Sequence, residues 1–235
     1  MNNLFGIDFG ELPFFLIATV LAFTLHEFAH AYVADRFGDP TPRSMGRLSL
    51  NPRGHIDIMG ILLVLLAGFG WAKPVLIRSS FFKKPRLASV LVSVAGPLSN
   101  LLLAVLGMLT VFLLAHFHAY DGMSIGVLKA VSLFLQIHIL LNLGLFIFNL
   151  LPLPPLDGYR IIYEFLPIQW RERMRTFEQY AVLVFLVIVL IHPLYSVTLG
   201  PILDLRWDLL RGMNQIFVML FGDQGQLSKI GILML

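Results

Sequence analysis

His26, Glu27 and His30 form an H-E-x-x-H motif inside a stretch, residues 12–33, that is otherwise almost entirely apolar. Histidines four residues apart share one face of a helix, so their imidazole rings can bind the same metal ion. Glu27 lies beside them and suits the general base that accepts a proton from a metal-activated water. Ionisable side chains are costly inside a membrane helix and usually mark function, so the apolar surroundings favour a hydrolytic metal site.

A third ligand is needed, because a catalytic zinc site has three protein ligands and one open position for water. No histidine follows at the metzincin spacing, since position 36 is arginine. Asp157 is the best candidate, within the sequence NLLPLPPLDG of residues 149–158. The prolines there should end the preceding helix, and unwound backbone at membrane depth is tolerated where it lines a cavity. Gly158 allows the close backbone approach that would bring the carboxylate to the metal.

The composition is that of a polytopic membrane protein. Of 235 residues, 57% are hydrophobic and only 13% are charged, whereas soluble domains have about 25% charged residues. The absence of cysteine excludes disulfides and cysteine-ligated metal sites, and residues 1–11 lack the Lys or Arg of a standard signal peptide. The basic residues border the apolar spans instead of forming one basic face, so nucleic-acid binding is not expected.

Six segments predict an all-α polytopic fold with about five to six transmembrane helices. The five strongest apolar spans are residues 12–33, 56–71, 87–117, 125–151 and 180–191. A weaker segment at residues 197–221 contains charged residues and suits either a tilted span or an interfacial helix. Residues 1–221 are therefore expected to form a single integral-membrane domain, with a catalytic core at about 12–165 and a loose tail at 222–235.

The second span is too short to cross comfortably, because a helix of residues 56–71 reaches about 24 Å against a hydrocarbon core of about 30 Å. Basic residues flank this span on both sides: Arg36, Arg43, Arg47, Arg53, Lys73, Arg78, Lys83, Lys84 and Arg86. A full crossing would place them on opposite faces, contrary to the positive-inside rule. We therefore expect residues 35–86 to form a re-entrant, membrane-associated cytosolic layer, in which short β-strands are allowed.

The same rule orients the rest of the chain. The N-terminal residues contain Asp8 and Glu11 but no basic residue, so they are expected outside, as is the loop at residues 116–124. Arginines return to the cytosolic side after the fourth span, at Arg160, Arg171, Arg173 and Arg175. The active site, with His26 and His30, is then expected in the cytosolic half of the bilayer.

These motifs together resemble those of the site-2 protease family of intramembrane zinc metalloproteases. HEFAH at residues 26–30 precedes NLLPLPPLDG on a separate span, and AGPLSN at residues 95–100 resembles another family element. GRLSLNP, HID and GWAKPV, between residues 46 and 75, resemble the compact bacterial branch without a PDZ domain. The resemblance covers about residues 20–165 and implies a protein of the bacterial cytoplasmic membrane.

The resemblance implies one Zn²⁺ per chain, with His26, His30 and Asp157 as its ligands and Glu27 as the general base. It also implies that Asn149 binds the substrate backbone or the developing oxyanion. The implied activity is hydrolysis of peptide bonds within transmembrane segments, which is regulated intramembrane proteolysis. The implied partners are single-span membrane proteins in the lipid bilayer, and the oligomeric state is left open.

Two non-enzymatic functions are the alternatives. A pseudoprotease would bind zinc and only hold membrane segments, and it would be expected to lack Glu27 or a metal ligand. Neither is lost in this sequence. A metal carrier would need polar ligands along a full transmembrane path, whereas the candidate ligands gather in the cytosolic half of the spans.

The remaining polar residues of the apolar segments are expected to have structural roles. His138 and Asn142 lie on one face of the fourth span and are expected to form hydrogen bonds between helices. Small residues on one face of the third span favour close helix packing, and Asn100 on that face could orient a metal ligand. His55 and Asp57 are expected to brace a loop.

Overall fold

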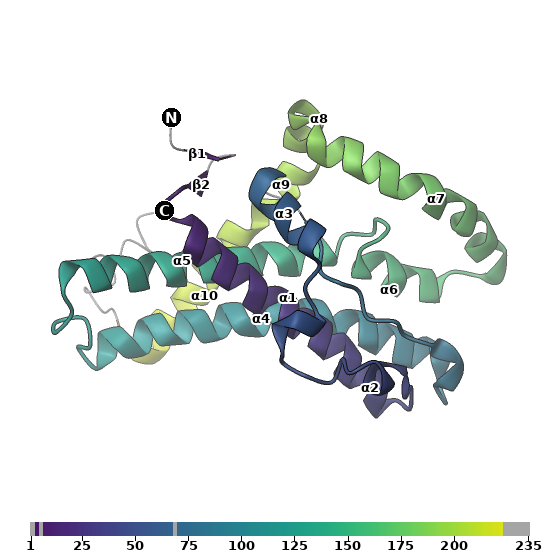
Figure 1. Ribbon diagram of the computed structural model, residues 1–235, viewed down its shortest axis with the longest axis horizontal. Coiled ribbons are helices and arrows are strands. Elements are labelled where there is room, and N and C mark those ends of the chain that lie inside the picture. The colour runs from purple at the N-terminus through teal and green to yellow at the C-terminus, as the bar shows by residue number, and fades with distance from the viewer. Residues whose placement is uncertain (1–2, 5–6, 68–69, 223–235) are drawn as a thin grey trace.

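The computed structural model describes residues 3–4, 7–67 and 70–222, and shows an elongated, almost entirely helical molecule (Figure 1). Three long helices form its centre: α1 (Leu12–Arg36), α4 (Pro85–His116) and α5 (Ile125–Asn149). Each of the three is long and apolar enough to cross a membrane. The helical fold class is confirmed at this level, and these helices correspond to the first, third and fourth predicted spans.

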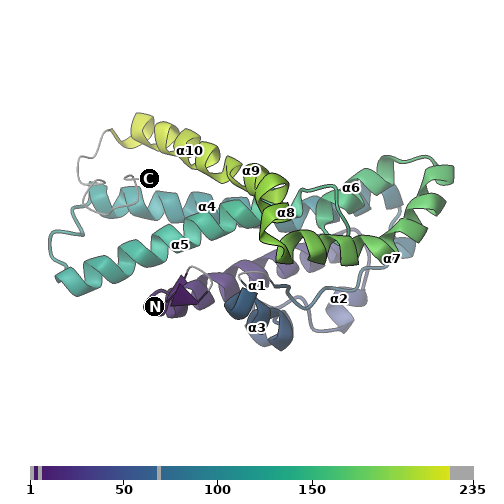
Figure 2. The same ribbon diagram turned by 90° about the horizontal axis from the view of Figure 1, so that it is seen from above.

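The helices α4 and α5 lie side by side along most of their length, as both ribbon views show (Figures 1 and 2). Ser124 caps the start of α5, where its hydroxyl accepts a hydrogen bond from the Val127 amide at 3.4 Å. The contact between the two helices buries Phe112 from α4 with Ile139 and Leu143 from α5. In a membrane, close packing of this kind holds helices together, because lipid tails are as apolar as the side chains themselves.

Helix α1 crosses this pair and packs against both α4 and α5 (Figure 1). Its buried face contains small residues without exposed surface: Ala18, Ala22, Ala31 and Ala34. Small side chains let helix backbones approach closely. His26 and His30 lie on the same buried face, so the packing of α1 turns the H-E-x-x-H motif inward.

The segment between α1 and α4 contains only short elements. They are α2 (Thr41–Ser44), α3 (Ile58–Ala67) and the 3₁₀ turns η1 (Pro52–Gly54) and η2 (Ser79–Phe81). The ten residues of α3 reach about 15 Å, only half the thickness of the hydrocarbon core. This length is compatible with the expected shallow insertion.

The short β-strands allowed for this layer are not formed in its described residues, 35–67 and 70–86. A single bridge there pairs Ile56 with Ala72. The two strands that the structure does contain, β1 (Asn3–Leu4) and β2 (Ile7–Asp8), pair with each other near the N-terminus.

The proline-containing sequence ends α5, as predicted. Residues 150–156 are not helical, and α6 (Asp157–Phe165) begins at the candidate metal ligand. The turn folds back so tightly that a Cβ atom at Gly158 would lie 2.1 Å from the carbonyl oxygen of Leu150. Only glycine fits there, which confirms the expected close approach.

The remaining helices are α7 (Ile168–Leu190), α8 (His192–Val197), α9 (Leu199–Leu203) and α10 (Leu205–Phe221). Figure 2 shows α7 and α10 extending in opposite directions from the turn formed by α8 and α9. Only the stretch Tyr180–Leu190 of α7 is strongly apolar, so α7 falls short of a full span by itself. The predicted loose tail lies, from residue 223 on, outside the described residues.

Candidate metal centre

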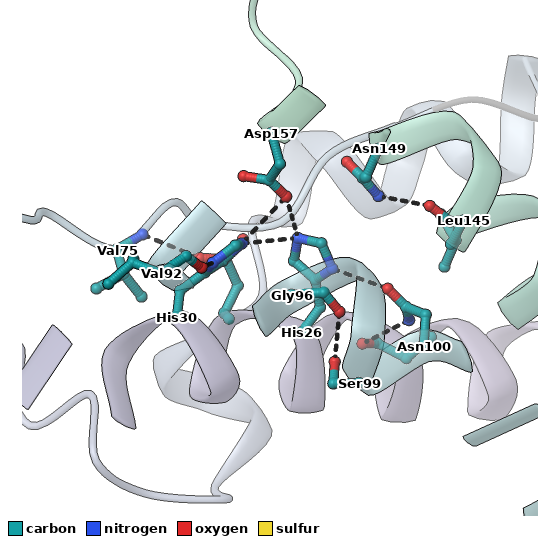
Figure 3. A network of polar contacts seen from close by, with 12 residues as sticks. His26, His30, Val75, Val92, Gly96, Ser99, Asn100, Leu145, Asn149 and Asp157 are labelled. Atoms are coloured by element: carbon teal, nitrogen blue, oxygen red, sulfur yellow. Dashed lines mark hydrogen bonds and ion pairs between the residues drawn. The ribbon is translucent and has the colours of Figure 1, made fainter. Parts of the chain in front are cut away.

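Three buried side chains from α1 and α6 converge on one point (Figure 3). The Nε2 atoms of His26 and His30 lie 3.0 Å apart, and each lies 3.2 Å from Oδ2 of Asp157. Ligands of a tetrahedral zinc ion, each about 2.0–2.2 Å from the metal, lie about 3.3 Å from one another. The observed separations are therefore close to those that zinc requires.

The protonation pattern of the two histidines also fits a metal. His26 Nδ1 lies 2.8 Å from the side-chain oxygen of Asn100, and His30 Nδ1 lies 2.7 Å from the carbonyl oxygen of Val92. Carbonyl oxygens only accept hydrogen bonds, so both Nδ1 atoms must carry the hydrogen. Each neutral ring then presents the Nε2 lone pair to the centre, which is the form that binds a metal.

The third ligand atom supports the same conclusion. Oδ2 of Asp157 is buried and has no hydrogen-bond donor among the described residues. A buried carboxylate oxygen without a donor is costly, and here it faces two nitrogen lone pairs. Three electron-rich atoms in one buried position are stabilised by a cation between them, so the residues present fit a bound zinc ion.

Asn100 fixes the ring of His26 from α4. Its side-chain nitrogen donates to Oδ1 of Asn142 on α5 at 2.9 Å, which leaves its oxygen to accept from His26. Asn142 in turn donates to the backbone oxygen of His138 at 2.8 Å, and Nε2 of His138 donates to the backbone oxygen of Leu103 at 3.2 Å. The expected interhelical role of His138 and Asn142 is confirmed, and Asn100 contacts the candidate ligand His26 in the way that the orienting role requires.

Gly96 allows α4 to approach the two histidines. A Cβ atom at this position would lie 2.4 Å from Nε2 of His30 and 2.6 Å from Cε1 of His26. Real side-chain carbons do not come so close, so any larger residue would displace the ligand rings. The small-residue face predicted for the third span is therefore the face that packs against the metal centre.

Glu27 lies in the same cavity as the ligands and is only 8% exposed. Its Oε2 accepts a hydrogen bond from the backbone amide of Val75 at 2.9 Å. Its other oxygen, Oε1, has no hydrogen bond in the described part of the chain. The Val75 amide thus holds the carboxylate through Oε2, and Oε1 is available to accept a hydrogen bond from another group.

Asn149, the last residue of α5, also lines this cavity, whose volume is about 510 Å³. One hydrogen of its side-chain amide is donated to the carbonyl oxygen of Leu145 at 2.9 Å. The amide has a second hydrogen, which can be donated to another group. The structure therefore brings all the candidate site residues of the sequence into one cavity.

Arg160 lines the cavity from α6 and was not singled out as a site residue from the sequence. From the sequence, Arg160 served only as a positive charge that predicts which side of the membrane its segment faces. Part of the segment that follows α3 also lines the cavity, and the sequence had indicated this part only through the family resemblance of GWAKPV. The lining residues are Gly70, Trp71, Ala72, Pro74, Val75 and Ile77. The Val75 contact is made by a backbone amide, which every residue but proline carries, so no residue type could have indicated it.

His55 and Asp57 lie away from the candidate metal centre and brace the segment between α1 and α4, as expected. Nε2 of His55 lies 2.6 Å from the carbonyl oxygen of Ser49, and Oδ1 of Asp57 accepts from the Gly60 amide at 2.9 Å. Within residues 3–4, 7–67 and 70–222, the group of His26, His30 and Asp157 is the one set with metal-ligand spacing.

Comparison with known proteins identifies the family. The model of Peptidase family M50 matches residues 14–133 and 123–192, which together cover most of the chain. This protein belongs to peptidase family M50. The resemblance to site-2 proteases is thereby confirmed, and the chain is an integral-membrane zinc metalloprotease of the intramembrane type. A site of two histidines and one carboxylate, with room for a water, is also the ligand set that catalytic zinc uses.

Curated relatives agree with this assignment. YwhC of Bacillus subtilis, named as a candidate zinc metalloprotease, is 51% identical over 220 residues, which are 92% of this chain and 98% of that protein. Rip2 of Mycobacterium tuberculosis H37Rv, with the same kind of name, is 35% identical over 78% of this chain and 69% of its own length. Rip2 of Mycolicibacterium smegmatis is 33% identical over 74% of this chain and 65% of its own length. No solved structure is a significant match.

Replacement of Asn100 by leucine should weaken zinc binding by about 10–100-fold, because the ring of His26 loses the hydrogen bond that sets its tautomer. Competition with a chelator, followed by metal analysis of the purified protein, measures this change. Ser99→Ala is the matched control, since the Ser99 hydroxyl donates to the backbone of Gly96 and does not contact the ligands. Equal zinc affinity of Asn100→Leu and wild type would contradict the orienting role.

Proposed function

We propose that His26, His30 and Asp157 hold one Zn²⁺ and that Glu27 is the general base of an intramembrane protease acting on single-span membrane proteins. The observation that supports these assignments is the convergence of three buried ligand atoms in the cavity that also contains the Glu27 carboxylate. The ligand atoms are supplied by α1, which is long enough to span a membrane, and by the first residue of α6, which follows the turn that ends α5. The reaction centre therefore lies at the depth of the substrate's own membrane segment.

The residues of the cavity divide the chemistry among them. Bound zinc polarises the scissile carbonyl and lowers the pKa of a water toward neutrality. Glu27 accepts a proton from the attacking water through its available oxygen and delivers it to the leaving nitrogen. The buried surroundings strengthen these electrostatic interactions, because little bulk water competes with them.

Asn149 completes the site as a donor to the substrate. Its free amide hydrogen can bind a substrate carbonyl or the oxygen that gains negative charge during attack. Asn149 lies at the end of α5, beside the non-helical turn, and is one of the residues that line the cavity. A substrate helix must unwind before attack, because its amides are shielded by helical hydrogen bonds.

The non-enzymatic alternatives are less well supported. A pseudoprotease does not need a general base. Glu27 is nevertheless buried beside the candidate ligands, with Oε2 bound by the Val75 amide and Oε1 available to a water. A carrier needs free polar ligands along the membrane, yet Asn100, Asn142 and His138 bond to one another and to backbone oxygens. Family membership also favours the enzyme.

Replacement of Glu27 by glutamine should leave zinc bound and lower cleavage by about 100-fold or more, because general acid–base catalysis contributes about 10²–10⁴ in rate. The measurement is cleavage of a single-span reporter in detergent micelles, with zinc content determined on the same preparation. Asn149→Ala should also lower turnover while retaining zinc. Zinc binding with equal cleavage by wild type and Glu27→Gln would contradict the assigned mechanism.

We further propose a topology in the bacterial cytoplasmic membrane with the N-terminus outside and the metal centre in the cytosolic half. The brevity of α3 supports a re-entrant layer at residues 35–86, which would keep its basic residues on the cytosolic side. We propose that α10 and the apolar part of α7, together with α8, add spans to the three long helices, and that the re-entrant segment at α3 brings the number to five or six. The polar residues Asp204 and Arg206 lie at the junction of α9 and α10.

Single cysteines at positions 43 and 78 should react with a membrane-impermeant reagent from the same, cytosolic side. Both native arginines are exposed, and the chain contains no other cysteine. A cysteine at Asp121, in the loop between α4 and α5, should label from the opposite side and serves as the control. Labelling of positions 43 and 78 from opposite sides would refute the re-entrant layer.

A further inference from the structure

The chain that follows α3 crosses α1 as an extended segment on its way to α4 (Figure 1). We call residues 73–78 the strap. None of the strap residues is in a helix or a strand. Side chains and backbone groups of other segments nevertheless form hydrogen bonds with the strap backbone at several positions. In the middle of the strap, the backbone amide of Val75, which Figure 3 labels, donates to the carboxylate of Glu27.

Arg47 binds the strap immediately before Val75. Its guanidinium donates to the carbonyl oxygens of Lys73 at 3.1 Å and Pro74 at 3.0 Å, and also to that of Gly54. The residue is only 3% exposed and has no acidic partner in the described part of the chain. An arginine is seldom so buried, and here backbone oxygens rather than a carboxylate satisfy it.

Two further contacts hold the ends of the strap. The Lys73 amide donates to the carbonyl oxygen of His55 at 2.8 Å, and the Arg78 amide donates to Oδ2 of Asp39 at 2.6 Å. Asp39 has no exposed surface, and its Oδ1 accepts from the Thr41 amide at 2.9 Å. The strap is therefore fixed on both sides of Val75 by groups that do not touch the metal ligands.

These contacts have a consequence for Glu27. A carboxylate on a flexible side chain can turn away from the reacting water, and a displacement of about 1 Å can reduce catalysis by about 100-fold. The Val75 amide occupies Oε2 and so restricts the carboxylate to orientations that keep Oε1 in the cavity. A backbone donor does this well, because the strap holds it in place before substrate arrives.

We propose that the strap is the positioning element for the general base, and that Arg47 is a positioning residue that aims the Val75 amide at Glu27. This inference rests on the proposed role of Glu27 in the reaction. It assigns a function to the cytosolic layer beyond membrane insertion: the layer orients one carboxylate of the active site through a single backbone hydrogen bond.

Val75→Pro tests the inference most directly, because proline removes the amide hydrogen and residue 75 lies outside any helix or strand. The turnover number for a single-span reporter in detergent micelles should fall by about tenfold or more, toward the 100-fold of a 1 Å misplacement. KM should stay within about twofold and the zinc content should be unchanged, since the ligands do not contact the strap.

Leu76→Pro is the matched control. It places the same ring one residue later, where the side chain is exposed and the amide makes no hydrogen bond in the described structure. Its turnover should stay within about twofold of wild type. Arg47→Met provides a second variant, which should reduce turnover as Val75→Pro does because the two carbonyl oxygens of the strap lose their donor.

Two results would overturn the inference. Equal turnover of Val75→Pro and Leu76→Pro would show that the amide does not position Glu27. A loss confined to KM would show that the strap, which also lines the cavity, contacts substrate instead. A different result would contradict the proposed function itself: cleavage of the reporter by Glu27→Gln at the wild-type rate. The two proposals can therefore fail independently.

Discussion

Each candidate ligand histidine donates its Nδ1 hydrogen to an oxygen of α4, and the geometry of the candidate metal centre depends on this pair of bonds. The bonds to Asn100 and to the Val92 carbonyl set both tautomers and aim both Nε2 lone pairs at one point. They require α4 to lie against α1 without an intervening side chain, which Gly96 permits. Asp157 can then complete the site from a different element, because the position of the metal is already defined.

The apolar setting explains why so many polar groups around the centre are paired. Unpaired polar groups are costly away from water, so a site inside the membrane must be surrounded by satisfied neighbours. Asn100 and Asn142 meet this need on the side of α4 and α5. On the side of the segment between α1 and α4, Arg47 and Asp39 bind the strap backbone, and the strap binds Glu27. Both sides stiffen the geometry that hydrolysis requires.

Much of this architecture follows from local patterns. The H-E-x-x-H spacing predicts a shared helix face, the prolines after Asn149 predict the end of α5, and long apolar runs predict three of the helices. The C-terminal region was harder to predict, because charged residues interrupt its apolar stretches and the structure divides it into four helices. Short β-strands were allowed at residues 35–86. In the described residues of this segment, side chains such as Arg47 and Asp39 form the hydrogen bonds to the backbone instead, and a single bridge joins Ile56 to Ala72.

The sequence by itself determined which atoms can bind the metal and which carboxylate can act as base, because ligand chemistry depends on residue type. Tertiary structure alone decided how those atoms are oriented. Oriented hydrogen bonds join residues far apart in the chain, such as His26 with Asn100 and Glu27 with Val75, and the second of these uses a backbone amide. A backbone amide or carbonyl is the same at nearly every position, so its role becomes visible only when folding places it beside a partner.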